Sequence, residues 1–274
     1  MYCIFTKFVS LKQIIMPARY LLFFLLMFTA CSTAKRTALL PYGPAWGALY
    51  QQRAAEYKAL CLQAYQLAAI RVEEMSHQQT LRPRAIVTDI DETVLDNSPF
   101  TVHYALQGRQ YDQASWEEWT ARAACDTVPG ALSFFRYAAS KGFAIYYITN
   151  RLEKERAATL RNLQRWGFPQ ADDEHLLLSS GSSDKEARRM QVAKQYEIAM
   201  LVGDNLGDFS DVFYKAAPEE RDAAVIRLRL EFAGRFIMLP NVMYGDWLSA
   251  LYPKGAPLNQ QRADSALKAA LKGY

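Results

Sequence analysis

Five short apolar runs recur along the chain, and segments with helical spacing of apolar and charged positions separate most of them. Strands without polar alternation are buried on both faces, which is typical of a parallel sheet covered by helices. The pattern therefore predicts an α/β fold in which helices pack on both faces of a parallel sheet. The predicted strands cover residues 84–89, 143–149, 175–179, 198–203 and 235–239.

The interval between the first two predicted strands is long, begins with an aromatic, turn-rich segment and contains a Val-Pro-Gly break at 128–130. We therefore predict a small, mainly helical cap at about 97–128, inserted after the first strand. Helical spacing elsewhere predicts connecting helices and an amphipathic C-terminal helix. The predicted helices cover 46–79 as one or two helices, 131–140, 153–166, 184–195, 219–231 and 259–271.

The N-terminus has the pattern of a secretory leader. Residues 1–30 hold three basic residues and no acidic one, and they end in an apolar run followed by Cys31. That run has about ten residues, whereas a span of the bilayer takes about 20. We expect a signal peptide over 1–30, a polar tether over 31–45 and a domain over 46–274.

Removal of the leader leaves a chain that is close to neutral. The sequence has 32 Lys and Arg against 28 Asp and Glu, and the leader holds three of the basic residues. This balance gives no argument for nucleic-acid binding. Cys61 and Cys125 either pair in an exported compartment or stay buried and free. Met16 also begins a leader, so a start at Met1 or at Met16 stays open.

Polar groups follow each of the first four predicted strands. The carboxyl ends of parallel strands meet at one edge of a sheet, so we expect these groups to form one site. The first two, Asp89 and Asp91, lie on the same side of a strand and repel each other unless a cation is near. Solvated turn aspartates are the alternative for this pair alone. The four segments are Asp89 and Asp91, Thr149-Asn150-Arg151, Ser179 to Lys185, and Asp204 to Asp208.

These segments resemble, in order, the four motifs of the haloacid dehalogenase (HAD) superfamily of phosphotransferases. They are more specifically similar to the class C (subfamily IIIB) acid phosphatases, bacterial lipoproteins that act as 5′-nucleotidases and on similar esters. The resemblance implies a Rossmann-like core with a small cap, and a phosphoric monoester hydrolase. It is carried by 89–93, 95–100, 148–151 and 203–209, and extended by 236–241 and 244–247.

The resemblance implies a role for each matched residue. Asp89 is the expected nucleophile, which would form an aspartyl-phosphate, and Asp91 is the expected acid for the leaving oxygen. Carboxylates suit both roles by their own chemistry. Thr149 and the backbone amide of Asn150 would hold the phosphate, and Lys185 would offset charge between nucleophile and phosphate.

The resemblance also implies a Mg²⁺ site. The expected ligands are a carboxylate oxygen of Asp89, the main-chain carbonyl of Asp91 and a carboxylate oxygen of Asp204. Four carboxylates against one lysine leave a deficit of positive charge, which a hard divalent cation would offset. Asp208 is expected to orient waters or Lys185 rather than to bind the metal.

Substrate selection leaves several alternatives. Aromatic side chains can stack on a nucleobase or a nicotinamide ring, and we predict this role for Phe100 and Tyr244. Asn97 either touches the substrate or shapes the turn. We expect 5′-nucleotides as substrates; sugar phosphates, phosphoproteins, or a catalytically silent surface-anchored binding protein are the alternatives. The oligomeric state stays open, with a homodimer among the options.

The segment Thr29-Ala30-Cys31 resembles the lipobox of bacterial lipoproteins, in which the cysteine is acylated, although Phe28 stands where Leu is usual. The resemblance predicts a lipid on Cys31 and attachment to a membrane of the cell envelope. Ser32 replaces the aspartate that retains many such proteins at the inner membrane, so we expect the bacterial outer membrane. Ordinary cleavage near Ala30, with Cys31 incidental, is the alternative.

Overall fold

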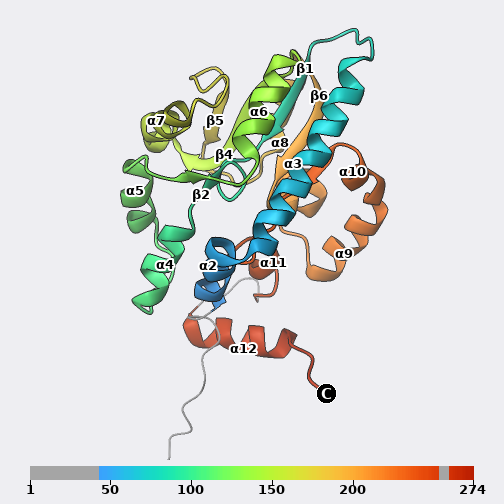
Figure 1. Ribbon diagram of the computed structural model, residues 1–274. Coiled ribbons are helices and arrows are strands. Elements are labelled where there is room, and N and C mark those ends of the chain that lie inside the picture. Colours follow the sequence, from blue (N-terminus) through green and yellow to red (C-terminus); the bar gives the residue numbers. More distant parts are fainter. Residues whose placement is uncertain (1–42, 253–258) are drawn as a thin grey trace, which may run out of the picture. The chain divides into compact units, whose positions relative to one another are not determined.

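The computed structural model describes residues 43–252 and 259–274, which Figure 1 colours along the chain. The predicted signal peptide, Cys31 and the tether up to residue 42 lie outside the described residues. Within the described residues, no helix combines the length and the apolar character that a membrane span requires.

A five-stranded sheet forms the centre of the fold, with the strand order β5-β4-β1-β6-β7 and parallel pairing throughout. The predicted parallel α/β fold is thereby confirmed, and each strand end lies within three residues of its predicted place. Because β1 lies in the middle, its carboxyl end is flanked by those of β4 and β6. The strands are β1 (Arg84–Thr88), β4 (Ala144–Leu152), β5 (Leu176–Ser179), β6 (Glu197–Gly203) and β7 (Phe236–Met238).

Helices cover both faces of this sheet, because successive strand residues point to opposite sides. Ile86 and Tyr147 pack with α3 and α6 on one face, where Figure 1 shows these two helices next to each other. Val87 and Tyr146 pack with α8 on the other face. The helices of the core are α3 (Ala55–Ser76), α6 (Ala131–Ser140), α7 (Arg156–Trp166), α8 (Glu186–Ala193), α9 (Pro218–Arg227), α10 (Arg229–Ala233) and α11 (Asp246–Ser249).

Some predicted helices are shorter or divided in the structure. The helix expected over 46–79 is two helices, α2 (Gly43–Arg53) and α3, because the backbone at Ala54 is extended. The helix expected over 219–231 divides at Leu228 into α9 and α10. The predicted C-terminal helix is α12 (Gln260–Ala270). Short 3-10 turns occupy Glu153–Glu155, Leu206–Asp208 and Asp211–Phe213.

The segment expected as a cap contains two helices, α4 (Ser98–Leu106) and α5 (Gln113–Ala121). Its base is a two-stranded antiparallel ribbon, in which β2 (Leu95–Asp96) pairs with β3 (Asp126–Thr127). Buried aromatic side chains hold the two helices together: Phe100, Tyr104 and Trp116.

Helix α2 packs against two different parts of the fold. Ala45 contacts the aromatic cluster of the cap, and Gly47 lies against Met243 in the loop before α11. A Cβ on Gly47 would lie 2.9 Å from Met243 Cγ and 3.1 Å from the backbone N and Cα of Met243. The absent side chain at Gly47 therefore allows α2 to approach the loop that carries Tyr244.

We expect Gly47→Ala to destabilise the protein by about 1–3 kcal/mol, because the added methyl group overpacks a backbone contact. Gly43→Ala is the matched control in the same helix, since a Cβ there would meet no atom of the described residues within 4 Å. Thermal unfolding should show a Tm several degrees lower for Gly47→Ala and an unchanged or higher Tm for Gly43→Ala. Equal Tm values for the two variants would contradict this interpretation of the α2 contact.

Candidate active site

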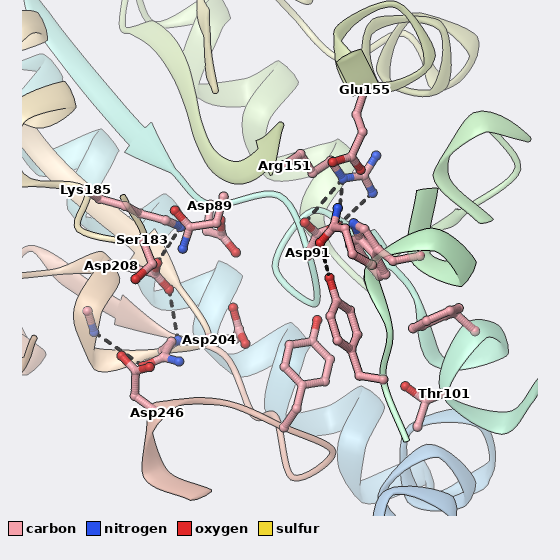
Figure 2. A pocket seen from close by; sticks show the side chains of 18 of the residues that line it. Asp89, Asp91, Thr101, Arg151, Glu155, Ser183, Lys185, Asp204, Asp208 and Asp246 are labelled. Carbon is pink, nitrogen blue, oxygen red and sulfur yellow. Dashed lines mark hydrogen bonds and ion pairs between the residues drawn. The ribbon is translucent and has the colours of Figure 1, made fainter. Parts of the chain in front are cut away.

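A cavity of about 390 Å³ lies beside the carboxyl ends of β1, β4 and β6, and Figure 2 shows its lining side chains. The sequence predicted that polar groups from separate strand ends would converge here. Most of them do, together with aromatic side chains from the cap and from the loop before α11. The lining includes Asp89, Asp91, Asn150, Lys185, Asp204 and Asp208, and the aromatic residues Phe100, Tyr104, Tyr111, Trp116, Tyr214 and Tyr244.

Lys185 lies between two carboxylates from different strand ends. Its Nζ forms ion pairs with Asp89 and, at 2.6 Å, with Oδ1 of Asp208. All three side chains are buried. Although burial opposes the charge of the lysine, the two adjacent carboxylates raise its pKa, so it stays protonated. The second carboxylate oxygen of Asp208 accepts a 2.9 Å hydrogen bond from the backbone N–H of Asn205.

Gly203, the last residue of β6, gives Asp208 the space for this position. A Cβ on Gly203 would lie 2.4 Å from both Cβ and Oδ2 of Asp208. The chain turns back through the 3-10 turn Leu206–Asp208 directly after the strand, which brings the carboxylate against the strand end. Any larger residue at position 203 would displace Asp208 from Lys185.

Asp204 is held by two neutral donors. Its Oδ1 accepts a 3.1 Å hydrogen bond from the hydroxyl of Thr93, and its Oδ2 accepts one of 2.8 Å from Asn241. Burial, and then the nearby carboxylates of Asp208 and Asp89, raise the pKa of Asp204 well above its usual value. The orientation of this carboxylate is therefore fixed, although no basic side chain in the described part of the chain forms an ion pair with it.

Asp89, Asp204 and Asp208 can each place one carboxylate oxygen within 4.8 Å of the others. Burial is the main cause that raises the pKa of Asp89 to about 7; Lys185 opposes this effect, and Asp208 and Asp91 add to it. Several buried carboxylates with one lysine are an electrostatic environment that a divalent cation would stabilise. Oxygen donors alone suit a hard cation. These residues therefore fit a divalent metal site.

This oxygen cluster differs in one respect from the expected ligand set. Asp208 joins Asp89 and Asp204, whereas the carboxylate of Asp91 faces Arg151. The expectation for Asp91 concerned its main-chain carbonyl, and that stays a prediction.

Arg151 forms an ion pair with Asp91 and donates hydrogen bonds to it from two of its nitrogens, as Figure 2 shows. Its Nη2 lies 2.7 Å from Oδ1 of Asp91, and its Nε lies 3.0 Å from Oδ1 and 3.3 Å from Oδ2. The side chain of Arg151 is 1% exposed, and its guanidinium lies 5.6 Å from the centre of the Trp116 ring. The sequence had shown Arg151 inside a motif, but it had not indicated this partner.

Thr149 and Asn150 occupy different positions at the end of β4. Thr149 is buried, and its hydroxyl is 3.4 Å from Oδ2 of Asp91. Asn150 lines the cavity, and its side-chain oxygen accepts a 2.8 Å hydrogen bond from Arg188. Arg188 also donates to the carbonyl of Thr149, so it fixes this turn of the chain.

Of the predicted stacking residues, Phe100 and Tyr244 both line the cavity. Phe100 makes edge-on contacts with Tyr104 and with Trp116, with ring centres 5.1 and 5.2 Å apart. Ring contacts therefore hold together the cap side of the aromatic wall, by which we mean the aromatic side chains that line the cavity. The sequence had not indicated that Tyr111 belongs to it, since Tyr111 lies in the connection between α4 and α5.

Cys61 and Cys125 are both buried free thiols. The alternative of a disulfide between them, which the sequence left open, is therefore not realised in the structure. Cys125 lies at the base of the cap, and Cys61 lies on α3.

The family model described as HAD superfamily, subfamily IIIB (acid phosphatase), matches residues 45–247. A solved structure of the class C acid phosphatase from Bacillus anthracis is 37% identical, covers 86% of this chain and 99% of its own, and superposes with a TM-score of 0.82. A second structure of that enzyme, with tungstate bound, gives the same values.

Two curated plant proteins are more distant relatives. Acid phosphatase 1 of Solanum lycopersicum is 26% identical over 131 residues, which are 44% of this chain and 50% of that protein. The stem 31 kDa glycoprotein of Glycine max is 28% identical over 125 residues, 43% of this chain and 49% of that protein. The chain thus spans about half the length of the curated relatives it matches.

We expect Gly203→Ala to weaken binding of a divalent cation by about 10–100-fold, because a displaced Asp208 disturbs the oxygen cluster and Lys185. Calorimetric titration with Mg²⁺ and with Mn²⁺ would measure this change. Gly43→Ala serves as the control, since its Cβ would meet nothing within 4 Å in the part of the chain that the structure describes. Unchanged cation affinity in a folded Gly203→Ala protein would show that the metal does not depend on the position of Asp208.

Proposed function

Because this chain belongs to the acid phosphatases of the HAD superfamily, subfamily IIIB, we propose that it hydrolyses phosphate monoesters through a covalent intermediate on Asp89. The observation that carries the proposal is the placement of Asp89, Lys185 and Asp91 along one cavity. Lys185 holds a nucleophilic carboxylate at the end of β1, and Asp91, two residues on, faces the same cavity.

The reaction takes two steps. An oxygen of Asp89 attacks phosphorus in line with the ester bond, the ester bond breaks, and Asp91 gives its proton to the leaving oxygen. Water then attacks the aspartyl-phosphate, Asp91 accepts a proton from that water, and the bond to Asp89 breaks to release inorganic phosphate. Lys185 offsets negative charge between Asp89 and the phosphate throughout.

We propose that the divalent cation bound at this site is Mg²⁺. Asp89, Asp204 and Asp208 would supply the side-chain oxygens for it, and the main-chain carbonyl of Asp91 would be the further ligand. Held by these residues, Mg²⁺ would supply Lewis-acid stabilisation of the negative charge on the phosphate oxygens. Burial raises the pKa of Asp89 to about 7. Its ionised carboxylate therefore needs additional positive charge nearby, which a divalent cation would supply.

We propose 5′-nucleotides as the substrates. A volume of about 390 Å³ suits a small molecule, and an aromatic wall with Phe100 and Tyr244 offers faces on which a base can stack. Sugar phosphates would fill the phosphate end without using that wall. A phosphoprotein is much larger than a cavity of about 390 Å³, so only its phosphorylated side chain would enter.

The site of action that we propose is the cell envelope, with the chain attached by a lipid on Cys31, at the outer membrane. The support is the leader and the Thr-Ala-Cys-Ser segment at 29–32. Mass spectrometry of the mature N-terminus would find an acylated cysteine; an unmodified N-terminus near Ala30 would contradict the proposal.

The first test of the function is phosphate release from AMP, nicotinamide mononucleotide, glucose 6-phosphate and p-nitrophenyl phosphate. We expect release with Mg²⁺, none with EDTA, and a loss of more than about 10³-fold in Asp89→Asn, because the amide is not a nucleophile. Faster release from AMP than from glucose 6-phosphate would support nucleotides as the substrates.

Asp222→Asn, a change outside the catalytic cavity, is the control and should keep full activity. A folded protein that releases phosphate from none of the four esters would be a silent binding protein. Equal rates for all esters would contradict the proposed use of the aromatic wall.

A further inference from the structure

The buried side-chain amide of Asn97 contacts the carboxylate of Asp91, the proposed acid. We propose that Asn97 is a positioning residue, oriented by the cap through Trp119 and Cys125. Together with Arg151, it occupies Oδ1 of Asp91 and leaves Oδ2 to carry the proton that reaches the leaving oxygen. This inference rests on the proposed phosphatase function and adds to it the source of the acid's orientation.

The two oxygens of Asp91 have unequal surroundings. Oδ1 accepts three short hydrogen bonds, from Asn97 Nδ2 at 2.9 Å and from Nη2 and Nε of Arg151 at 2.7 and 3.0 Å. Oδ2 has only long contacts among the described residues, 3.3 Å from Arg151 Nε and 3.4 Å from the hydroxyl of Thr149. A proton on Oδ1 would face three donors, so the proton belongs on Oδ2.

The orientation of the Asn97 amide is chemically fixed. Its Oδ1 accepts hydrogen bonds from the indole N–H of Trp119 at 2.9 Å and from the thiol of Cys125 at 3.2 Å. An indole N–H can only donate, so the oxygen of the amide must face Trp119 and the NH2 group must face Asp91. The reversed amide would place its oxygen against the Asp91 carboxylate and would lose both donors.

The surroundings of Asn97 leave it no other arrangement. The residue is fully buried, and its backbone N–H donates a 2.7 Å hydrogen bond to Glu92. Asn97 does not belong to the lining of the cavity. Of the two roles that the sequence left open, shaping the turn is therefore the one the contacts support, and holding Asp91 is added to it.

The two donors come from the cap. Trp119 lies on α5 and Cys125 precedes β3, whereas Asp91 follows the central strand of the core. Cys125 is itself anchored, because the side chain of Asn162 accepts from its N–H at 2.8 Å and donates to its carbonyl at 3.0 Å. Through Asn97, the cap therefore orients Asp91 from the side away from the cavity. Other side chains of the cap, which are aromatic, line the cavity itself.

The test uses the dependence of rate on the leaving group. The ribose oxygen of AMP is a poor leaving group that needs the proton, whereas p-nitrophenolate leaves without it. We expect kcat/KM in Asn97→Ser to fall about 10–100-fold more for AMP than for p-nitrophenyl phosphate. Trp119→Phe, a milder change, should lower the ratio of the two rates about 3–10-fold.

Trp166→Phe is the matched control. It removes the same indole N–H group from the carbonyl of Cys125, 2.9 Å away, and not from Asn97. We expect both esters to be hydrolysed in the wild-type ratio, with a lower Tm at most.

An equal loss for both esters in Asn97→Ser and Trp119→Phe would overturn the proposal, since a structural role affects both alike. The same shift in the ratio for Trp166→Phe would also overturn it. Failure of the wild-type protein to hydrolyse either ester is a different result, because it would remove the proposed function itself.

Discussion

The balance of charge at the carboxyl edge of the sheet is the constraint on which the rest of the structure depends. Asp89, Asp204 and Asp208 are buried close together, and buried charges are costly unless they are paired and hydrogen-bonded. Lys185, the backbone N–H of Asn205 and the donors on Asp204 meet part of that requirement. Because Gly203 has no side chain, Asp208 can lie against the end of β6 and join this cluster.

The fold keeps two neighbouring aspartates in separate electrostatic environments. Asp89 and Asp91 are two residues apart and would repel each other, yet each forms an ion pair with a basic side chain of its own. Lys185 comes from the segment after β5, and Arg151 comes from the end of β4. One carboxylate is thereby kept as a nucleophile beside a metal site, and the other is kept apart as an acid, in our proposal. Such a division is how one fold runs two kinds of carboxylate chemistry.

The sequence predicted the parallel sheet and the convergence of its polar strand ends, because burial on both faces and strand order leave a clear local pattern. The pairing of Arg151 with Asp91 was not predictable, since it depends on side chains 60 residues apart whose strands meet only in the sheet. The proposed role of Asn97 was not predictable for the same reason, because its donors, Trp119 and Cys125, come within hydrogen-bond distance only in the folded chain.

The attachment of the cap has a consequence for how such a protein can diverge. The cap is joined to the core at both ends, through the β2–β3 ribbon, through Asn162 on Cys125, and through Glu155, which accepts a 2.9 Å hydrogen bond from Thr120. Its tip, by contrast, is exposed over residues 106–111 and contains Tyr111, which lines the cavity. Insertions or exchanges at the tip can therefore alter substrate selectivity in the course of evolution, while the attachments at the base of the cap keep Asp91, the acid in our proposal, in its position.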